Sequence, residues 1–182
     1  MNPVPFSLVP FPGEIDLPSL RLSGTIVRRG DLLSIVYELR GDLSVLAIPR
    51  RAEFPERKHR LWEETCLEFF LGARDTAGYL EFNLSPGGHW NAYRFSAYRE
   101  GMREEEAIAS LPFRVDPGAE NLRLSLDLEI GKILPGNADA EAGICAVLRT
   151  ASGGRCHWAL AHPGPRPDFH RRDGFVLTLP SE

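Results

Sequence analysis

The chain has 182 residues, of which 43% are hydrophobic and 25% charged, the usual balance of a globular protein. Its formal net charge of −4 gives no reason to expect nucleic acid or an anionic membrane surface as a partner. A chain of this length can form one domain, residues 1–182, with a core that needs no disulfides. The three cysteines lack metal-ligand spacing and lie in strand-like runs, so we expect buried free thiols.

The first residues predict neither a leader nor a membrane span. Residues 1–18 contain no basic residue and no continuous apolar run, unlike a secretory signal. No window approaches the roughly 18 apolar residues of a transmembrane helix. We therefore expect a cytoplasmic protein. Prolines recur through residues 3–12, and because proline cannot donate to a sheet ladder, any strand there is an edge strand.

The next segments have the pattern of a hairpin. Residues 21–28 and 32–40 alternate apolar and polar side chains around Gly30, which predicts two paired strands. Residues 43–48 are expected to form a short strand that ends at Pro49. The charged run that follows, RRAEFPERKHR, is typical of a solvated loop.

Residues 61–98 predict three consecutive antiparallel strands, over 65–71, 79–85 and 89–98. Turn-forming residues separate the three runs. Because side chains alternate along a strand, Leu80, Phe82 and Leu84 should all point into the core.

The opposite face of this predicted sheet is polar. Glu81 and Asn83 point to it, and we expect Glu68 and Arg94 to join them there. Glu68 and Glu81 are then candidate partners for the Arg94 guanidinium, since an unpaired buried charge is costly. Such a face is either a solvated surface or a ligand platform.

Later segments complete an all-β pattern. Residues 100–110 predict one short helix, because acidic residues near its start suit the helix dipole. Strands are expected over 122–129, 143–150, 156–161 and 175–179, with a loop over 131–138. About ten or eleven short strands and one short helix indicate an antiparallel β-sandwich.

Residues 162–174, HPGPRPDFHRRDG, form a stiff segment because three prolines fix the backbone at alternate positions. Phe169 is its one large apolar side chain. We expect Phe169 to be buried and the segment to act as a structural latch. Its neighbours Asp168 and His170 should bond back to the sheet or to loop amides, without contacting a ligand.

The sequence contains no G-x-S-x-G, P-loop or H-E-x-x-H motif. The pairs Glu63–Glu64, or Glu68 with Glu81, have the groups needed for glycoside hydrolysis, but acidic pairs are common on surfaces. We therefore predict that the protein is not an enzyme.

Four potential metal ligands lie close in sequence: His157, His162, Asp168 and His170. Their spacings match no structural zinc pattern, and a loop rich in histidine and proline is commonly structural. We therefore predict no metal.

Aromatic and polar residues nevertheless suggest a sugar ligand. An aromatic ring covers the apolar C–H face of a pyranose, while charged and amide groups bind its hydroxyls. The predicted ligand-binding residues are Trp62, Glu64, Glu81, Asn83, Trp90, Arg94 and Trp158.

Three runs resemble a known superfamily: LWEETCLEFFLG, YLEFNLSPGGHWNAYRF, and a distal AVLRT…CHWALAHPGPRPDFHRRDGFVLTL. They are similar to the DOMON-like superfamily and, more narrowly, to bacterial relatives of the type 9 carbohydrate-binding modules. The resemblance extends over roughly residues 21–179. It implies a β-sandwich that binds a ligand without transforming it.

The resemblance leaves two ligands open. Relatives bind a saccharide or sugar-like metabolite, or else haem b used for electron transfer. The haem alternative would use Met102 with His89 or His170 as axial ligands, although Met102 lies among glutamates. We expect a saccharide, no cofactor, and no nucleic-acid or membrane partner; the resemblance names no protein partner.

Overall fold

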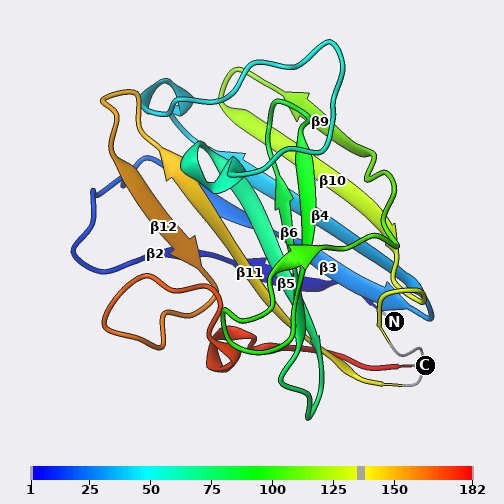
Figure 1. The fold of residues 1–182 in the computed structure, drawn as a ribbon. Helices are drawn as coiled ribbons and strands as arrows, with labels where there is room; N and C mark the ends of the chain where they lie inside the picture. The colour runs from blue at the N-terminus through cyan, green and yellow to red at the C-terminus, as the bar shows by residue number, and fades with distance from the viewer. Residues whose placement is uncertain (1, 135–137, 182) are drawn as a thin grey trace.

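The computed structural model describes residues 2–134 and 138–181 as two antiparallel β-sheets packed face to face. Figure 1 shows the sheet that contains β11 and β5 in front of the sheet that contains β3 and β4. The predicted antiparallel β-sandwich is confirmed. The described residues contain thirteen strands, more than the ten or eleven predicted.

The smaller sheet has five strands in the order β1-β3-β4-β10-β9. The predicted hairpin over residues 21–28 and 32–40 is confirmed as the pair β3 and β4. The strands are β1 (Val4–Ser7), β3 (Arg21–Arg29), β4 (Leu32–Arg40), β10 (Asn121–Glu129) and β9 (Phe113–Pro117).

The larger sheet has the order β2-β12-β11-β5-β6-β7-β8, and β13 also pairs with β11. The predicted adjacency of three strands within residues 61–98 is confirmed as β5-β6-β7. Proline-rich β1 and β2 each lie at the edge of a sheet, as predicted. The strands are β2 (Val9–Pro10), β12 (Arg155–Ala159), β11 (Ala140–Arg149), β5 (Cys66–Ala73), β6 (Tyr79–Leu84), β7 (Trp90–Phe95), β8 (Arg103–Glu104) and β13 (Leu177–Leu179).

Two local predictions are wrong. Residues 100–110 form no helix, because the Glu105 amide donates to the Ala92 carbonyl of β7 at 2.8 Å instead of within its own segment. Residues 43–48 begin with a 3-10 turn that Asp42 caps by accepting from the Ser44 amide. The helical segments of the described chain are three short turns, η1 (Leu43–Val45), η2 (Leu61–Glu63) and η3 (Arg172–Gly174).

The main core lies between the sheets, where the inner faces of β5 and β6 are apolar. Leu80, Phe82 and Leu84 are fully buried there, which confirms the predicted alternation. Phe82 stacks on Phe69 of β5 with ring centroids 4.3 Å apart. The Tyr37 hydroxyl of the smaller sheet crosses this layer and donates to the Glu68 carbonyl at 2.8 Å.

A second apolar cluster lies on the outer face of the larger sheet. It contains Phe70, Tyr79, Tyr93, Phe95 and Phe175, with Trp62 and Phe169 packed against it. Every residue of β5 and β6 is therefore buried, on one face or the other. All three cysteines are buried free thiols, as predicted.

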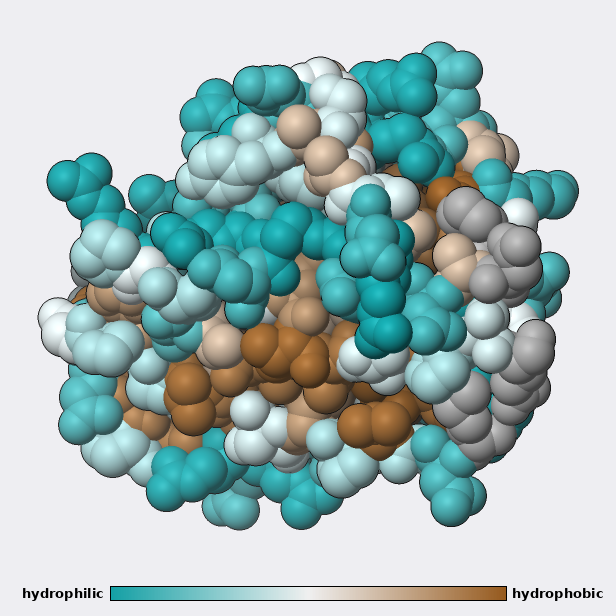
Figure 2. Space-filling model, turned by 90° about the horizontal axis from the view of Figure 1, so that it is seen from below, coloured by the Kyte–Doolittle hydropathy of each residue, from teal (hydrophilic) through white to brown (hydrophobic). Residues whose placement is uncertain are grey.

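Figure 2 shows one face of the surface, on which hydrophobic residues form a band bordered on both sides by hydrophilic residues. The large apolar side chains that are exposed among the described residues include Val4, Val9 and Val176. Among the described residues, no helix is both long and apolar enough to cross a bilayer.

The stacked pair in the main core gives a stability prediction. Phe82→Ala should lower the free energy of unfolding by about 3–5 kcal/mol, because it leaves a cavity against Phe69. Phe54→Ala is the matched control: Phe54 is 77% exposed, so the change should stay within about 0.5 kcal/mol. Urea unfolding measures both values. Equal losses in the two variants would contradict this assignment of the core.

Candidate functional site

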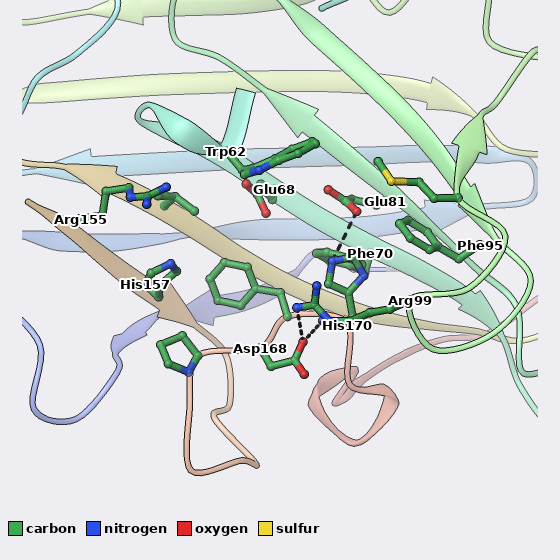
Figure 3. A pocket seen from close by; sticks show the side chains of 14 residues that line it. Trp62, Glu68, Phe70, Glu81, Phe95, Arg99, Arg155, His157, Asp168 and His170 are labelled. Atoms are coloured by element: carbon green, nitrogen blue, oxygen red, sulfur yellow. Dashed lines mark hydrogen bonds and ion pairs between the residues drawn. The ribbon is translucent and has the colours of Figure 1, made fainter. Parts of the chain in front are cut away.

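A pocket of about 320 Å³ opens on the outer face of the larger sheet. Its floor comes from β5 and β6, and one side comes from β11 and β12 (Figure 3). Three connecting segments supply the remaining walls: η2, the turn that carries Arg99 and Met102, and the C-terminal segment with Asp168 and His170. The pocket therefore joins parts of the chain that are far apart in sequence.

Two buried acids form the polar part of the floor. Glu68 of β5 is 2% exposed and Glu81 of β6 is 4% exposed. Asn83 lies directly across from Glu68 and donates to Glu81 Oε1 at 2.7 Å. Glu68 Oε1 accepts no hydrogen bond from the described residues, and its Oε2 lies 4.0 Å from the Cys145 thiol.

Burial makes both acids hold their protons more tightly. It raises the pKa of Glu68 well above the ordinary value, and the neighbouring Glu81 raises that pKa further. Burial also raises the pKa of Glu81 to about 7, although the Asn83 hydrogen bond and the Arg99 charge act in the opposite direction. Both floor acids therefore hold their protons to a higher pH than an exposed glutamate does, and Glu81 is about half protonated near pH 7.

His170 lies beside Glu81 but does not form an ion pair with it at neutral pH. Its Nε2 lies 3.8 Å from Glu81 Oε2, and its Nδ1 is 2.9 Å from the Tyr79 hydroxyl. The ring makes edge contacts with Phe70 and Phe95, at centroid distances of 5.3 and 5.0 Å. Burial lowers the pKa of His170 to about 4, and Arg99 lowers it further, so the imidazole is neutral.

Asp168 fixes one wall of the pocket. It accepts from the Tyr98 hydroxyl, from Arg99 Nη2 at 2.8 Å and from the His170 amide at 3.2 Å. Burial acts to raise the pKa of Asp168, but these hydrogen bonds outweigh burial and hold the pKa below its ordinary value. Asp168 is therefore an anion already neutralised by protein groups, unlike the two floor acids.

Aromatic rings supply the apolar part of the pocket. Trp62, on η2, is half-buried and contacts Tyr93 edge-on at a centroid distance of 6.0 Å. In the view of Figure 3 the Trp62 indole lies over the Glu68 carboxylate. Phe70 and Phe95 extend the apolar surface towards His170.

Arg155 and His157 of β12 line the opposite side of the pocket (Figure 3). Glu14 fixes His157, because its carboxylate lies 2.7 Å from Nδ1 and accepts the His157 amide at 2.6 Å. Arg155, Arg99 and Phe70 were not among the predicted ligand-binding residues, and His157 was considered only as a potential metal ligand. No local motif marks these four residues.

The structure brings some predicted residues together. Trp62 and Glu81 both line the pocket, and Asn83 lies beneath it, bonded to Glu81. Glu64 lies outside the pocket lining, where its carboxylate accepts from Arg149 Nη1 at 2.5 Å.

Trp90, Arg94 and Trp158 do not lie on this face. Trp90 is opposite Leu84 and Arg94 is opposite Leu80, so both point to the inner side of the sheet. The prediction that Arg94 lies with Glu68 and Glu81 is therefore wrong.

These three inward residues have other partners. Arg94 donates to Glu105 at 2.5 Å and to the Ile133 carbonyl at 2.9 Å. The Arg57 guanidinium lies 4.4 Å from the centre of the Trp90 ring. Trp158 is buried in the main core, where its Nε1 donates no hydrogen bond to a described residue.

The predicted latch is correct in the hydrogen bonds of Asp168 and His170 but wrong in the burial of Phe169. Asp168 and His170 bond back to the sheet and its turns, as expected. Phe169 is half-buried instead of buried, because one side of its ring faces the pocket. The segment is therefore also a pocket wall. Within residues 2–134 and 138–181, no group of three histidine, cysteine or acidic side chains has the arrangement of a metal site.

Comparison with solved structures identifies the same fold in sugar-related proteins. A candidate carbohydrate-binding protein from Bacteroides uniformis ATCC 8492 matches with a TM-score of 0.69 and 16% identity, over 97% of this chain and 85% of that one. A family 9 carbohydrate-binding module from Caldicellulosiruptor kristjanssonii, in complex with cellotriose, matches with a TM-score of 0.54 and 9% identity, over 80% of this chain and 67% of that one. No family model and no curated protein matches the sequence. At these identities the likeness is one of fold.

The buried floor predicts a specific pH dependence of stability. The pKa of Glu81 is about 7 in the folded protein and about 4.5 when exposed, so its contribution is present below pH 4.5 and is lost as pH rises through 7. Glu81→Gln should therefore gain stability relative to the wild type between pH 4.5 and pH 8, by roughly 3 kcal/mol.

Urea unfolding of both proteins at several pH values measures this difference. His170 is present in both, so its own titration cancels in the comparison. A difference that stays constant with pH would show that Glu81 ionises normally in the folded state.

Proposed function

We propose that this protein is a non-catalytic saccharide-binding module and that its ligand occupies the pocket over Glu68 and Glu81. One observation carries the proposal: the pocket combines aromatic surface with buried hydrogen-bonding groups at its floor. Saccharides present the matching pair of surfaces, an apolar C–H face and a rim of hydroxyls.

The arrangement assigns each part of the sugar to a part of the pocket. The Trp62 ring is available for the C–H face, because it is half-buried and lines the opening. Glu68 and Glu81 can accept from hydroxyls, or donate to them when protonated. A volume of about 320 Å³ lies at the lower end for small-molecule pockets, which favours one sugar unit or the end of a chain.

The structural comparisons support this reading of the pocket. Two of the solved structures that match over most of this chain are a candidate carbohydrate-binding protein and a module in complex with cellotriose. We also infer that the chain is a distant DOMON-like protein, on the sequence runs that resemble that superfamily.

Glycoside hydrolysis by Glu68 and Glu81 is the catalytic alternative. A glycosidase needs one carboxyl protonated and its partner ionised. Burial raises the pKa of both acids, and the Glu81 charge raises that of Glu68 further, so the electrostatics of the floor do not separate binding from hydrolysis. The likeness in fold to carbohydrate-binding proteins supports binding without catalysis.

The haem alternative stays a prediction. Met102 and His170 do line the same pocket, whereas His89 accepts from the Glu56 amide elsewhere. The residues do not fit haem b well, because His170 Nε2 faces the acid Glu81 and Met102 is 47% exposed.

Titration calorimetry with monosaccharides and their short oligomers tests the proposal. We expect binding that Trp62→Ala weakens by about tenfold or more, since an aromatic face contributes roughly 1–2 kcal/mol. Phe54→Ala, which changes an exposed aromatic outside the pocket, should bind as the wild type does.

Two results would count against this function. One is the absence of binding to any saccharide at millimolar concentration. The other is release of reducing sugar from an oligosaccharide on long incubation, which would make the protein a hydrolase.

Absorbance spectroscopy tests the haem alternative separately. We expect the purified protein to show no Soret band and to take up no added hemin, because the pocket floor is acidic. A stable Soret band that Met102→Ala or His170→Ala shifts would favour the electron carrier.

A further inference from the structure

We propose that the ligand carries a positively charged amino group and that Glu68 and Glu81 together bind it. This inference rests on the proposed saccharide-binding function. It makes the ligand an amino sugar instead of a neutral sugar. It concerns which chemical class of saccharide the pocket selects.

The first observation is that no arginine or lysine of residues 2–134 and 138–181 forms an ion pair with either floor acid. Arg99 also lines the pocket, but its guanidinium is bound to Asp168 at 2.8 Å. The contact of Glu81 with His170 is 3.8 Å long and involves a neutral imidazole. A buried carboxyl is either protonated or paired with a basic group, so the floor offers two acids that a cation from outside can ionise and pair with.

The second observation is a buried acceptor that has no donor, on a residue that lines the pocket. Glu68 is 2% exposed and lines the pocket, yet its Oε1 accepts no hydrogen bond from the described residues. A buried polar atom in this state is costly unless a ligand or water satisfies it. The Asp168 carboxylate differs from Glu68, because it accepts hydrogen bonds from three protein groups: the Tyr98 hydroxyl, the Arg99 guanidinium and the His170 amide.

The positions of the two acids suit one shared group. Glu68 faces Asn83 across the β5–β6 pair, and Glu81 lies two residues along β6 on the same face. Such diagonal neighbours have Cα atoms about 7–8 Å apart, close enough for two glutamates to converge. An ammonium carries three N–H donors and no acceptor, so it can donate to both carboxylates at once.

The walls also favour a cation. Trp62 and Phe70 line the pocket beside the floor acids (Figure 3). The faces of aromatic rings attract cations, and they do so more strongly where water is excluded. An aromatic ring can therefore pack against the apolar C–H face of an amino sugar and also attract its ammonium group.

A neutral sugar would use this floor less well. Its hydroxyls can hydrogen-bond to Glu68 and Glu81 in their protonated form, but only a cation can form an ion pair with the ionised carboxylates. The raised pKa values of Glu68 and Glu81 mean that each acid holds its proton to a higher pH than an exposed glutamate does. An ammonium that binds there favours the ionised form, so its binding should release protons to the buffer.

Calorimetry at pH 7 with four probes tests the inference: glucose, glucosamine, N-acetylglucosamine and cyclohexylamine. We expect glucosamine to bind at least about tenfold more tightly than glucose, since charge-assisted hydrogen bonds are about twice as strong as neutral ones. N-Acetylglucosamine, which lacks the charge, should lose this advantage. Repeating the glucosamine titration in two buffers of different ionisation enthalpy should show proton release.

Variants locate the effect. Glu68→Gln and Glu81→Gln should each weaken glucosamine binding more than glucose binding, and so remove most of the preference for glucosamine. Glu129→Gln is the matched control, because Glu129 is exposed on the smaller sheet. Unfolding curves confirm that each variant is folded, and the wild-type comparison of probes stands even where a variant is not.

Each outcome decides between the two proposals. Equal binding of glucose and glucosamine overturns the amine inference and leaves the saccharide function intact. Binding of cyclohexylamine together with glucosamine, but of no neutral sugar, supports amine recognition and contradicts a general saccharide function. Binding of none of the four probes overturns the inference and removes its basis in the proposed function.

Discussion

The structure depends on one constraint: strands β5 and β6 are buried on both faces. On the inner side, residues such as Phe69 and Phe82 satisfy this constraint by apolar packing. On the outer side the same strands carry Glu68 and Glu81, which must be neutralised or hydrogen-bonded because water reaches them only through the pocket. Asn83 satisfies one oxygen of Glu81, and no described residue satisfies Glu68 Oε1. The unsatisfied acceptor belongs to a residue of the pocket floor, so the same strands form both the core and the candidate site.

The outer cover of β5 and β6 is held mainly by polar contacts at its edges. Asp168 joins the C-terminal segment to the turn at Arg99 by a hydrogen bond. The Tyr79 hydroxyl forms a hydrogen bond with His170 Nδ1 and accepts another from the Arg99 amide. These contacts fix the pocket walls before any ligand binds, so less conformational freedom is lost on binding. Arg99 adopts a left-handed conformation, with φ of 55°, to place its amide and guanidinium in these two contacts.

The fold could be predicted from sequence because local alternation determines it. Leu80, Phe82 and Leu84 specify which side of β6 faces the core, and turn residues separate the strands. The site was harder, since the relation between two strands depends on register. No local sequence pattern shows that the turn after β6 places Trp90 opposite Leu84. This register points Trp90 and Arg94 to the inner side of the sheet. The pocket also draws on distant segments, including Arg155 and the wall around Phe169, whose meeting only the tertiary structure defines. The predicted helix failed for a similar reason: its acids suit a helix start, but Glu105 pairs with β7 and Arg94.

The central claim is that a saccharide occupies the outer-face pocket, and a crystal structure grown with millimolar monosaccharide tests it most directly. We predict sugar density between the Trp62 ring and the carboxyls of Glu68 and Glu81, with a ligand atom within hydrogen-bonding distance of Glu68 Oε1. Density for the sugar at another surface, with Glu68 Oε1 bonded only to protein or water, would contradict the account.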